Sequence, residues 1–370
     1  MGAGKSEGIL PAQAIARLVA SGAIRAEHAL DSDQIQPASL DLRLGSPAYR
    51  VRASFLPGPR LTVAERLASI SLHEIDLTKG AVLETGCVYV VPLLESLALP
   101  ADIAAAANPK SSTGRLDIFT RIITDRAQEF DKLGPGYTGP LYLEVSPRTF
   151  PIIARAGSRL SQIRFRHGAA RLDDAMLTAL HGQDRLVDGQ LKVDGGLVLS
   201  IDLSDRDGIV GYRAKRHTGL IDVDRRDGYD TLDFWEPLPS RGRPEIILDP
   251  DQFYILVSNE AVHVPPLYAA EMVPFDPLVG EFRVHYAGFF DPGFGHSASG
   301  GSGSRAVLEV RSHEVPFILE HGQTVGRLVY EQLSERPNQL YGQGIGSSYQ
   351  AQGLKLSKHF RGLSISGASA

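Results

Sequence analysis

Cysteine is nearly missing from this sequence, because Cys87 is the only one in 370 residues. One cysteine excludes a disulfide framework and any zinc centre built from several cysteines. The 11 histidines show no spacing typical of a metal site. We therefore expect no metal ligand among the protein side chains, and no zinc.

Long apolar runs and an excess of positive charge are missing as well. Nowhere do 18 apolar residues follow one another, and no run of signal-peptide length opens the chain, so we expect a cytoplasmic protein with no membrane partner. Lys and Arg total 38 against 43 Asp and Glu, and the formal net charge is −5. This balance is not typical of proteins that bind nucleic-acid polymers, so small molecules are the expected partners.

Residues that form turns are abundant, with 38 glycines and 23 prolines. This composition favours many short strands over a helical bundle. Residues 10–29 have the apolar spacing of an amphipathic helix. Residues 39–44, 87–91, 141–145 and 306–310 are strand-like runs bounded by Gly, Pro and Asp. We predict a mainly β protein with minor helices.

The two halves of the sequence are similar to each other at an offset of about 165 positions. Residues 88–95 align with 253–260, and residues 143–145 align with 308–310. The length also suits two domains. The pattern therefore predicts two copies of one β domain.

The expected fold is therefore two tandem β domains. The first covers residues 1–170 and includes the N-terminal helix, and the second covers residues 171–338. Residues 339–370 form a C-terminal tail. The polar, glycine-broken residues 169–194 are expected to link the copies.

A candidate phosphate-binding turn lies at residues 109–115, Pro-Lys-Ser-Ser-Thr-Gly-Arg. Backbone and hydroxyl donors close to a glycine, with cations outside, are the groups that hold phosphate. The alternative is a simple helix cap with solvated charges. The aligned residues 275–280 of the second copy lack the serines and both cations. The fold therefore does not require these residues, which favours a functional role.

The turn resembles the Arg-Ser-Ser-x-x-Arg motif of dCTP deaminases and the related trimeric dUTPases, with Lys in place of the first Arg. Residues 35–45 resemble the N-terminal signature of these enzymes, and residues 96–100 resemble the strand end before the motif. The tail from Tyr341 to Gln352 resembles their C-terminal lid. The length fits the long, duplicated bacterial form. The resemblance therefore implies a mainly β fold of two tandem dUTPase-like domains, each β-barrel or jelly-roll-like, with minor helices.

In that family, one subunit supplies the phosphate turn and a neighbour supplies a hairpin and the catalytic glutamate. The first copy keeps the turn but has Gly134 where the hairpin needs an aspartate. The second copy has lost the turn and keeps the hairpin and the glutamate. The resemblance thus implies one composite site, with its turn from copy one and its hairpin from copy two.

The resemblance assigns the reaction to four residues. Glu309 would deprotonate the attacking water and relay the proton, while Ser111 and the carbonyl of Ala287 hold the water and Arg115 orients the carboxylate. Glu144 occupies the matching strand position in copy one and is the rival base. An outward-facing strand glutamate is usually solvated, which favours Glu309.

The remaining residues would bind the nucleotide. Asp291 would accept a hydrogen bond from the 3′-hydroxyl, and Phe294 would pack against the deoxyribose. The triphosphate with its Mg²⁺ would contact the turn. The full binding set is Lys110, Ser112, Asp291, Phe294, Tyr341 and Gln352, with the last two closing over the substrate. Replacing the family's first Arg by Lys110 exchanges a bidentate fork for a point charge.

The resemblance implies deamination of dCTP to dUTP and ammonia without zinc, which would supply dUTP for dTMP synthesis. A carboxylate would then do the proton handling that a metal does elsewhere. One alternative is a dUTP pyrophosphohydrolase or a bifunctional enzyme, and another is a non-catalytic nucleotide-binding regulator. The family also implies a homo-oligomer with threefold or pseudo-threefold packing.

Overall fold

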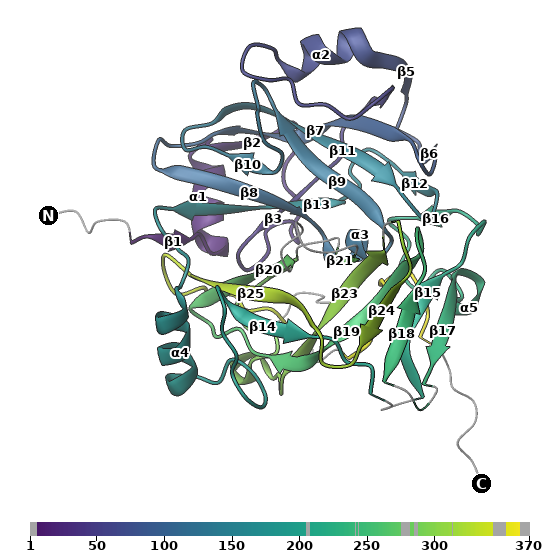
Figure 1. Cartoon of the computed structure of the whole chain (residues 1–370). Coiled ribbons are helices and arrows are strands. Elements are labelled where there is room, and N and C mark those ends of the chain that lie inside the picture. Colours follow the sequence, from purple (N-terminus) through teal and green to yellow (C-terminus); the bar gives the residue numbers. More distant parts are fainter. Residues whose placement is uncertain are drawn as a thin grey trace, which may run out of the picture.

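The computed structural model consists mainly of short strands, as predicted, with a few short helices (Figure 1). We call residues 6–170 the first half, residues 171–342 the second half and residues 353–362 the C-terminal segment. The structure describes residues 6–204, 208–240, 242, 244–274, 282–284 (backbone only), 288–312, 314–342 and 353–362.

Two sheets enclose the core of the first half. One has the order β1-β13-β8-β10, and the other has the order β5-β4-β7-β11-β9. Strand β3 also pairs with β13, and β2 also pairs with β7. Side chains from both sheets, such as Ile163 and Leu143, join one apolar core. The bounds are β1 (Gly8–Ile9), β2 (Ile24–Ala26), β3 (Leu40–Leu42), β4 (Ala48–Val51), β5 (Ser71–Ile75), β7 (Val88–Ala98), β8 (Ile103–Pro109), β9 (Ile118–Thr124), β10 (Lys132–Leu133), β11 (Thr138–Pro147) and β13 (Ser161–His167).

The second half contains the corresponding sheets. Their orders are β14-β25-β20-β22 and β17-β15-β19-β23-β21, and a pair β18-β24 lies beside them. A further sheet, β16-β12-β6, joins the two halves. The bounds are β6 (Ala81–Leu83), β12 (Ile152–Ala154), β14 (Leu197–Ser200), β15 (Ile209–Ala214), β16 (Ile221–Asp222), β17 (Trp235–Pro239), β18 (Glu245–Leu248), β19 (Phe253–Val262), β20 (Tyr268–Pro274), β21 (Phe282–Val284), β22 (Phe289–Phe290), β23 (Ser304–Ser312), β24 (Phe317–Glu320) and β25 (Thr324–Gln332).

Matching strands of the two halves pair in the same register. Strand β7 pairs with β11, placing Val90 opposite Glu144. Strand β19 pairs with β23, placing Ile255 opposite Glu309. The two glutamates therefore occupy equivalent points of equivalent sheets.

The helices are few and short. The helix expected over residues 10–29 ends earlier, since Gly22 has a φ of 75° and the chain then pairs with β7 as β2. The expected link at residues 169–194 contains a helix whose first turn is capped by the side chain of Asp173. The bounds are α1 (Ala12–Ala20), α2 (Val63–Ile70), α3 (Ser111–Gly114), α4 (Asp174–Gln183), α5 (Thr231–Phe234) and a 3₁₀ turn, η1 (Ser297–Ser299).

Insertions at equivalent places in the two halves pack differently. Residues 52–70, between β4 and β5, fold back on their own sheet, and Leu67 joins a small core with Ile123. Residues 215–234, between β15 and β17, extend to the first half, where β16 pairs in parallel with β12. The second insertion thus ties the halves together.

The C-terminal segment lies against this second insertion. The ring of Phe360 packs on Phe150 of the first half and on Trp235, at centroid distances of 6.5 and 5.8 Å. Backbone amides of Asp227 and Gly228 donate hydrogen bonds to carbonyls of the segment. No helix in the described part of the chain is long and apolar enough to cross a membrane.

Candidate active site

The candidate phosphate-binding turn, residues 109–115, begins at the last residue of β8 and is fixed there by hydrogen bonds. Strand β8 pairs with β13, and the Ser161 hydroxyl donates to the carbonyl of Asn108 at 3.0 Å. The backbone N–H of Lys110 donates to the carbonyl of Leu160 at 3.0 Å. The chain then enters the single turn α3, which carries Ser111 and the buried Ser112. Sheet pairing on both sides of the turn therefore sets where its side chains lie.

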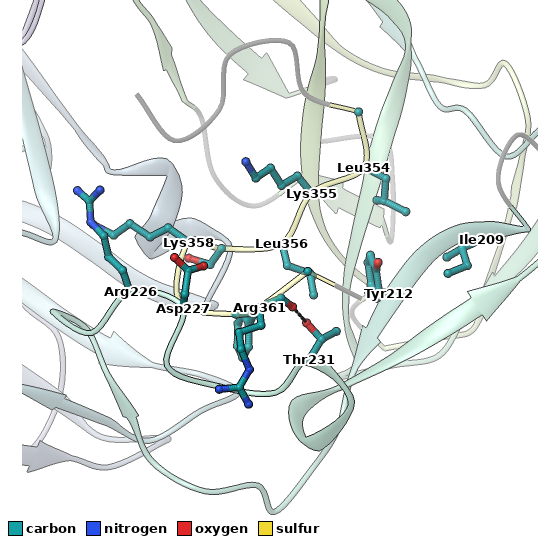
Figure 2. A pocket seen from close by; sticks show the side chains of 14 residues that line it. Ile209, Tyr212, Arg226, Asp227, Thr231, Leu354, Lys355, Leu356, Lys358 and Arg361 are labelled. Carbon is teal, nitrogen blue, oxygen red and sulfur yellow. Dashed lines mark hydrogen bonds between the residues drawn. The ribbon is translucent and has the colours of Figure 1, made fainter. Parts of the chain in front are cut away.

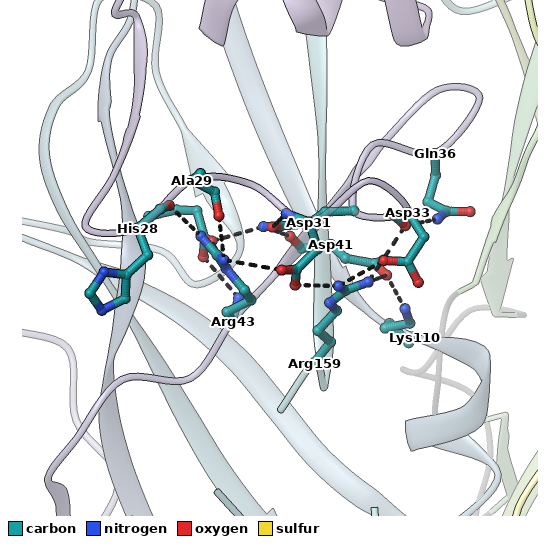
Figure 3. A network of polar contacts seen from close by, with 11 residues as sticks. His28, Ala29, Asp31, Asp33, Gln36, Asp41, Arg43, Lys110 and Arg159 are labelled. Atoms are coloured by element: carbon teal, nitrogen blue, oxygen red, sulfur yellow. Dashed lines mark hydrogen bonds and ion pairs between the residues drawn. The ribbon is translucent and has the colours of Figure 1, made fainter. Parts of the chain in front are cut away.

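Lys110 forms an ion pair with Asp41 of β3 (Figure 3). Asp41 is 1% exposed, and its Oδ1 atom has no hydrogen-bond partner among the described residues. Arg159 lies beside it, with its guanidinium 2.9 Å from Asp33 and 3.8 Å from Asp41. Sequence reasoning missed Asp41, although it lies in the N-terminal signature. The ion pair fixes the ammonium group of Lys110 beside Asp41.

Arg115 and Glu309 meet across the two halves. Arg115 Nε lies 3.9 Å from Glu309 Oε1, and the two residues are only 3% and 5% exposed. Arg115 comes directly after α3, whereas Glu309 lies on β23 between the core residues Leu308 and Val310. This is the contact that a composite site requires.

Burial raises the pKa of Glu309 to about 7, although the positive charge of Arg115 opposes the shift. A carboxyl group with a pKa near neutrality both accepts and returns a proton at physiological pH. The ordinary pKa of a glutamate, 4.5, would make it a much weaker base. The environment of Glu309 is thus typical of a general acid/base.

The hairpin residue Asp291 is also buried, at 8% exposure. Burial raises its pKa to about 6, and the nearby charge of Arg164 lowers it. Arg164 Nη2 lies 3.5 Å from Asp291 Oδ1. Arg164 belongs to the first half and was not recognised from the sequence, because nothing in its strand distinguishes it from a surface cation.

Phe294 packs inside an aromatic group at the same hairpin. Its ring contacts Phe290 edge-on at 5.0 Å and Tyr341 at 5.6 Å. The backbone N–H of Tyr341 donates to the carbonyl of Pro292 at 2.8 Å. Tyr341 therefore lies on the hairpin. Two predicted site residues, Ala287 and Gln352, lie outside the described residues, as do residues 275–280.

Glu144, the rival base, is buried rather than solvated, so the expectation for an outward strand residue is wrong here. It is 1% exposed, and Arg121 of the neighbouring strand donates to its Oε1 at 2.6 Å. The Arg121 guanidinium also stacks on Phe130 at 3.6 Å and donates to Ser54 of the first insertion. Glu144 is thus bound within its own half.

The C-terminal segment contacts the candidate phosphate-binding turn from the other side. Arg115 Nη1 donates to the Lys355 carbonyl at 2.9 Å, and the Ser357 hydroxyl lies 2.8 Å from the Ser112 carbonyl. His359, whose pKa burial lowers to about 4, lies 2.8 Å from both the Ser357 hydroxyl and the Val223 carbonyl. The segment therefore contacts both the turn and Arg115.

A pocket of about 770 Å³ lies between this segment and the second insertion (Figure 2). Its lining includes Lys358, whose pKa burial lowers to about 8, together with Arg226 and Arg361. The labelled cations point in different directions (Figure 2). Neither Arg115 nor Glu309 lines this pocket. Throughout the described residues, this pocket included, no three or more His, Cys, Asp or Glu side chains form a group that could hold a metal ion.

The fold and site together are those of a nucleotide-processing enzyme with a dUTPase-like architecture. Residues 6–169 match the family model "2'-deoxycytidine 5'-triphosphate deaminase (DCD) N-terminal domain". Residues 173–360 match the model of the C-terminal domain of the same enzyme. The chain belongs to the dCTP deaminase family. The match confirms the resemblance predicted from the sequence.

Individual relatives agree with this assignment. The chain is similar to the crystal structure of 2'-deoxycytidine 5'-triphosphate deaminase from Agrobacterium tumefaciens, with 68% identity, a TM-score of 0.86, and coverage of 89% of this chain and 99% of that chain. It is 32% identical over 151 residues to a dCTP deaminase of Halorubrum lacusprofundi, covering 40% of this chain and 71% of the relative. A "dCTP deaminase, dUMP-forming" of Coprothermobacter proteolyticus is 32% identical over 139 residues, covering 37% and 70%.

Proposed function

We propose that the protein hydrolyses dCTP to dUTP and ammonia at one site shared between its two halves. The observation that carries this proposal is the buried contact between Arg115 of the first half and Glu309 of the second half. The two halves thereby complement each other, since each supplies one part of the site. The product dUTP would serve dTMP synthesis.

In this proposal, Glu309 handles the protons of the reaction. Its carboxylate takes a proton from the attacking water as the oxygen bonds to C4 of cytosine, and it passes that proton to N3. Glu309 then takes the proton of the new C4 hydroxyl and passes it to the amino group, so that the C4–N bond breaks, the C4 carbonyl forms and ammonia leaves. A pKa of about 7 suits both directions of transfer.

Arg115 would orient the Glu309 carboxylate, and Ser111 would hold the water with the carbonyl of Ala287. The support is that Arg115 is itself fixed by its hydrogen bond to the Lys355 carbonyl. A guanidinium held on two sides has little freedom to leave the carboxylate. The C-terminal segment thus contributes to the order of the site before substrate arrives.

Substrate binding would use groups of the turn, of the hairpin and of the C-terminal tail. Lys110 and Ser112 would contact the triphosphate, with Lys110 turning from Asp41 to the phosphates. Asp291 would accept a hydrogen bond from the 3′-hydroxyl, while the aromatic side chains of Phe294 and Tyr341 would cover the sugar. Gln352 would complete the closure.

The reaction itself would need no zinc, and Mg²⁺ would bind through the triphosphate. Asp41, the buried carboxylate nearest to Lys110, is already paired with that lysine and lies 3.8 Å from Arg159, so its environment does not favour a protein-held metal. When bound, Mg²⁺ would neutralise phosphate charge beside Lys110 and Ser112. Both metal statements are proposals.

A bifunctional enzyme that also releases pyrophosphate is the second candidate. Two similar proteins, from Coprothermobacter proteolyticus and Dictyoglomus thermophilum, carry the name "dCTP deaminase, dUMP-forming". In such a reaction a second water would attack the α-phosphate of the bound nucleotide. A dUTP pyrophosphohydrolase without deaminase activity, and a non-catalytic regulator, are the remaining alternatives.

Ammonia and pyrophosphate released from dCTP distinguish these candidates. We expect one ammonia per dCTP and no pyrophosphate, and we expect turnover to survive 1,10-phenanthroline, which removes zinc. Equal amounts of ammonia and pyrophosphate would show the bifunctional enzyme. Pyrophosphate from dUTP without ammonia from dCTP would contradict deamination, and binding of dCTP without either product would indicate a regulator.

We also infer the organisation of the molecule from the matching strand registers. The two halves would be copies of one domain, at residues 1–170 and 171–338, with residues 339–370 as a tail. The protein would act in the cytoplasm as a homo-oligomer with threefold or pseudo-threefold packing. Light scattering coupled to size-exclusion chromatography measures the number of chains, and a monomer would contradict the last statement.

A further inference from the structure

Arg164 is the most deeply embedded cation between the two halves. It lies on β13 of the first half and is 2% exposed. Three positions earlier, the same strand carries Ser161, which pairs with Pro109, the first residue of the candidate phosphate-binding turn. Strand β13 therefore contacts one part of the site at Ser161 and the other part at Arg164.

The guanidinium of Arg164 contacts the second half on several sides. Its Nη1 donates to the Ala270 carbonyl at 3.1 Å and lies 3.4 Å from Glu331 Oε2. Its Nη2 donates to the Phe290 carbonyl at 3.3 Å and lies 3.5 Å from Asp291 Oδ1. Its plane stacks on the ring of Phe289 at 4.0 Å. These contacts fix the chain directly before Asp291.

The Asp291 carboxylate lies close to Arg164, but the guanidinium does not donate a short hydrogen bond to it. At 3.5 Å the two atoms attract each other, yet Oδ1 makes no hydrogen bond within the described residues. A buried acceptor that lacks a hydrogen bond carries a free-energy cost, and a donor that reaches it removes this cost. The substrate 3′-hydroxyl is a donor of the right kind. Arg164 thus supplies charge while leaving the acceptor open.

We propose that Arg164 is a positioning residue that aims the Asp291 carboxylate at the 3′-hydroxyl of the nucleotide and so sets the preference for a deoxyribose carrying that hydroxyl. This inference rests on the proposed function, because it assumes that Asp291 binds the sugar. It adds a first-half residue to the part of the site that comes from the second half.

The experiment compares dCTP with 2′,3′-dideoxy-CTP as substrates for the wild-type protein and for Arg164→Gln. We expect wild type to lose at least about tenfold in kcat/KM when the 3′-hydroxyl is removed, as for a hydrogen bond to a charged group. Arg164→Gln should lose a similar factor with dCTP, mainly through KM, and should no longer distinguish the two nucleotides. Arg164→Lys should recover part of the discrimination.

The controls separate positioning from folding. Arg166→Gln changes an exposed arginine on the same strand and should leave the discrimination intact. In an Asp291→Asn background, adding Arg164→Gln should cause no further loss of discrimination. If Arg164→Gln lowers kcat/KM equally for both nucleotides while wild type discriminates, Arg164 is merely structural. If wild type itself does not discriminate, the role proposed for Asp291 fails instead.

Discussion

Glu309 and Glu144 lie at equivalent positions of equivalent strands, and both are buried. Glu144 receives a 2.6 Å hydrogen bond from Arg121 of the adjacent strand in its own half. Glu309 faces Arg115 of the other half at 3.9 Å. The same strand position thus holds a closed ion pair in one half and a looser pair between the halves in the other.

The difference shows that burial alone does not make a glutamate a catalytic base. At Glu144, the guanidinium of Arg121 donates a direct hydrogen bond to the carboxylate oxygen Oε1. At Glu309 the cation is too far for a direct hydrogen bond, so burial dominates and the pKa rises to about 7. The distance from the carboxylate to the nearest guanidinium therefore differs between the two glutamates, and this difference supports Glu309 as the proposed base.

The two insertions explain how this difference arises. Residues 52–70 fold over the first-half sheet and place Ser54 against Arg121, which completes the cover of Glu144. Residues 215–234 instead reach across to the first half and support the C-terminal segment. One insertion therefore closes off a site, while the other helps to build one.

The largest expected effect comes from Glu309→Gln. It removes the group that moves protons, so kcat should fall by at least about 10²- to 10⁴-fold while dCTP still binds. Ammonia release and isothermal titration with dCTP measure the two properties. Glu144→Gln is the matched variant and should keep activity within about threefold. An inactive Glu144→Gln beside an active Glu309→Gln would reverse the assignment.

The arginines give the next effect. Arg115→Met should lower kcat by about 10²-fold, because the Glu309 carboxylate loses its orienting charge. Arg121→Met should spare activity and instead destabilise the fold by roughly 1–3 kcal/mol, since Glu144 is left buried without its partner. Steady-state kinetics and urea unfolding measure these losses. Comparable kinetic defects in both variants would remove the distinction between the two pairs.

The pH dependence of kcat tests the pKa of Glu309. The base must be ionised, so kcat should fall about tenfold per pH unit below about pH 7 and level off above it. Glu144→Gln should show the same profile if Glu309 is the base, as we propose. A profile that stays flat from pH 5 to pH 8 would show that no group with this pKa controls turnover.

The same pKa affects stability. Since the folded-state pKa of about 7 lies above the ordinary 4.5, the folded protein binds this proton more tightly than the unfolded chain. Wild type should therefore lose stability relative to Glu309→Gln as the pH rises from about 4.5 to about 7. Urea unfolding of both proteins at several pH values measures this difference.

The smallest effect is expected at the C-terminal segment. Ser357→Ala removes the hydroxyl beside the Ser112 carbonyl and should raise KM for dCTP about two- to fivefold with little change in kcat. Lys355→Ala should matter less, because Arg115 contacts the backbone carbonyl and not the side chain. A larger loss from Lys355→Ala than from Ser357→Ala would contradict this account of the segment.

The family and the mainly β fold could be predicted from the sequence. Strand alternation is a local signal, and the structure confirms the mainly β fold that it indicated. The family models confirm the family that the motifs resemble. The duplication of one domain and the phosphate-binding role of residues 109–115 stay predictions. The first helix was predicted too long, because apolar spacing continued past the glycine that ends it. The roles of Ser111, Ala287 and the other site residues stay predictions.

Other parts of the site carry no recognisable local signal. Arg164 and Arg121 are arginines on strands, and nothing in their neighbourhoods reveals that they become buried partners of carboxylates. Asp41 lies in a recognised motif, yet only the fold brings it to Lys110. Ion pairs between residues far apart in the sequence depend on which surfaces pack together, so the local sequence pattern does not predict them.

The sequence by itself determined the strands, the mainly β fold and the family. Only the tertiary structure decided that Glu309 has a raised pKa and that Glu144 is bound by Arg121. The physical reason is that strand formation follows from neighbouring side chains, whereas protonation depends on burial and on charges a few ångströms away. Those surroundings are created when the insertions and the two halves pack against each other.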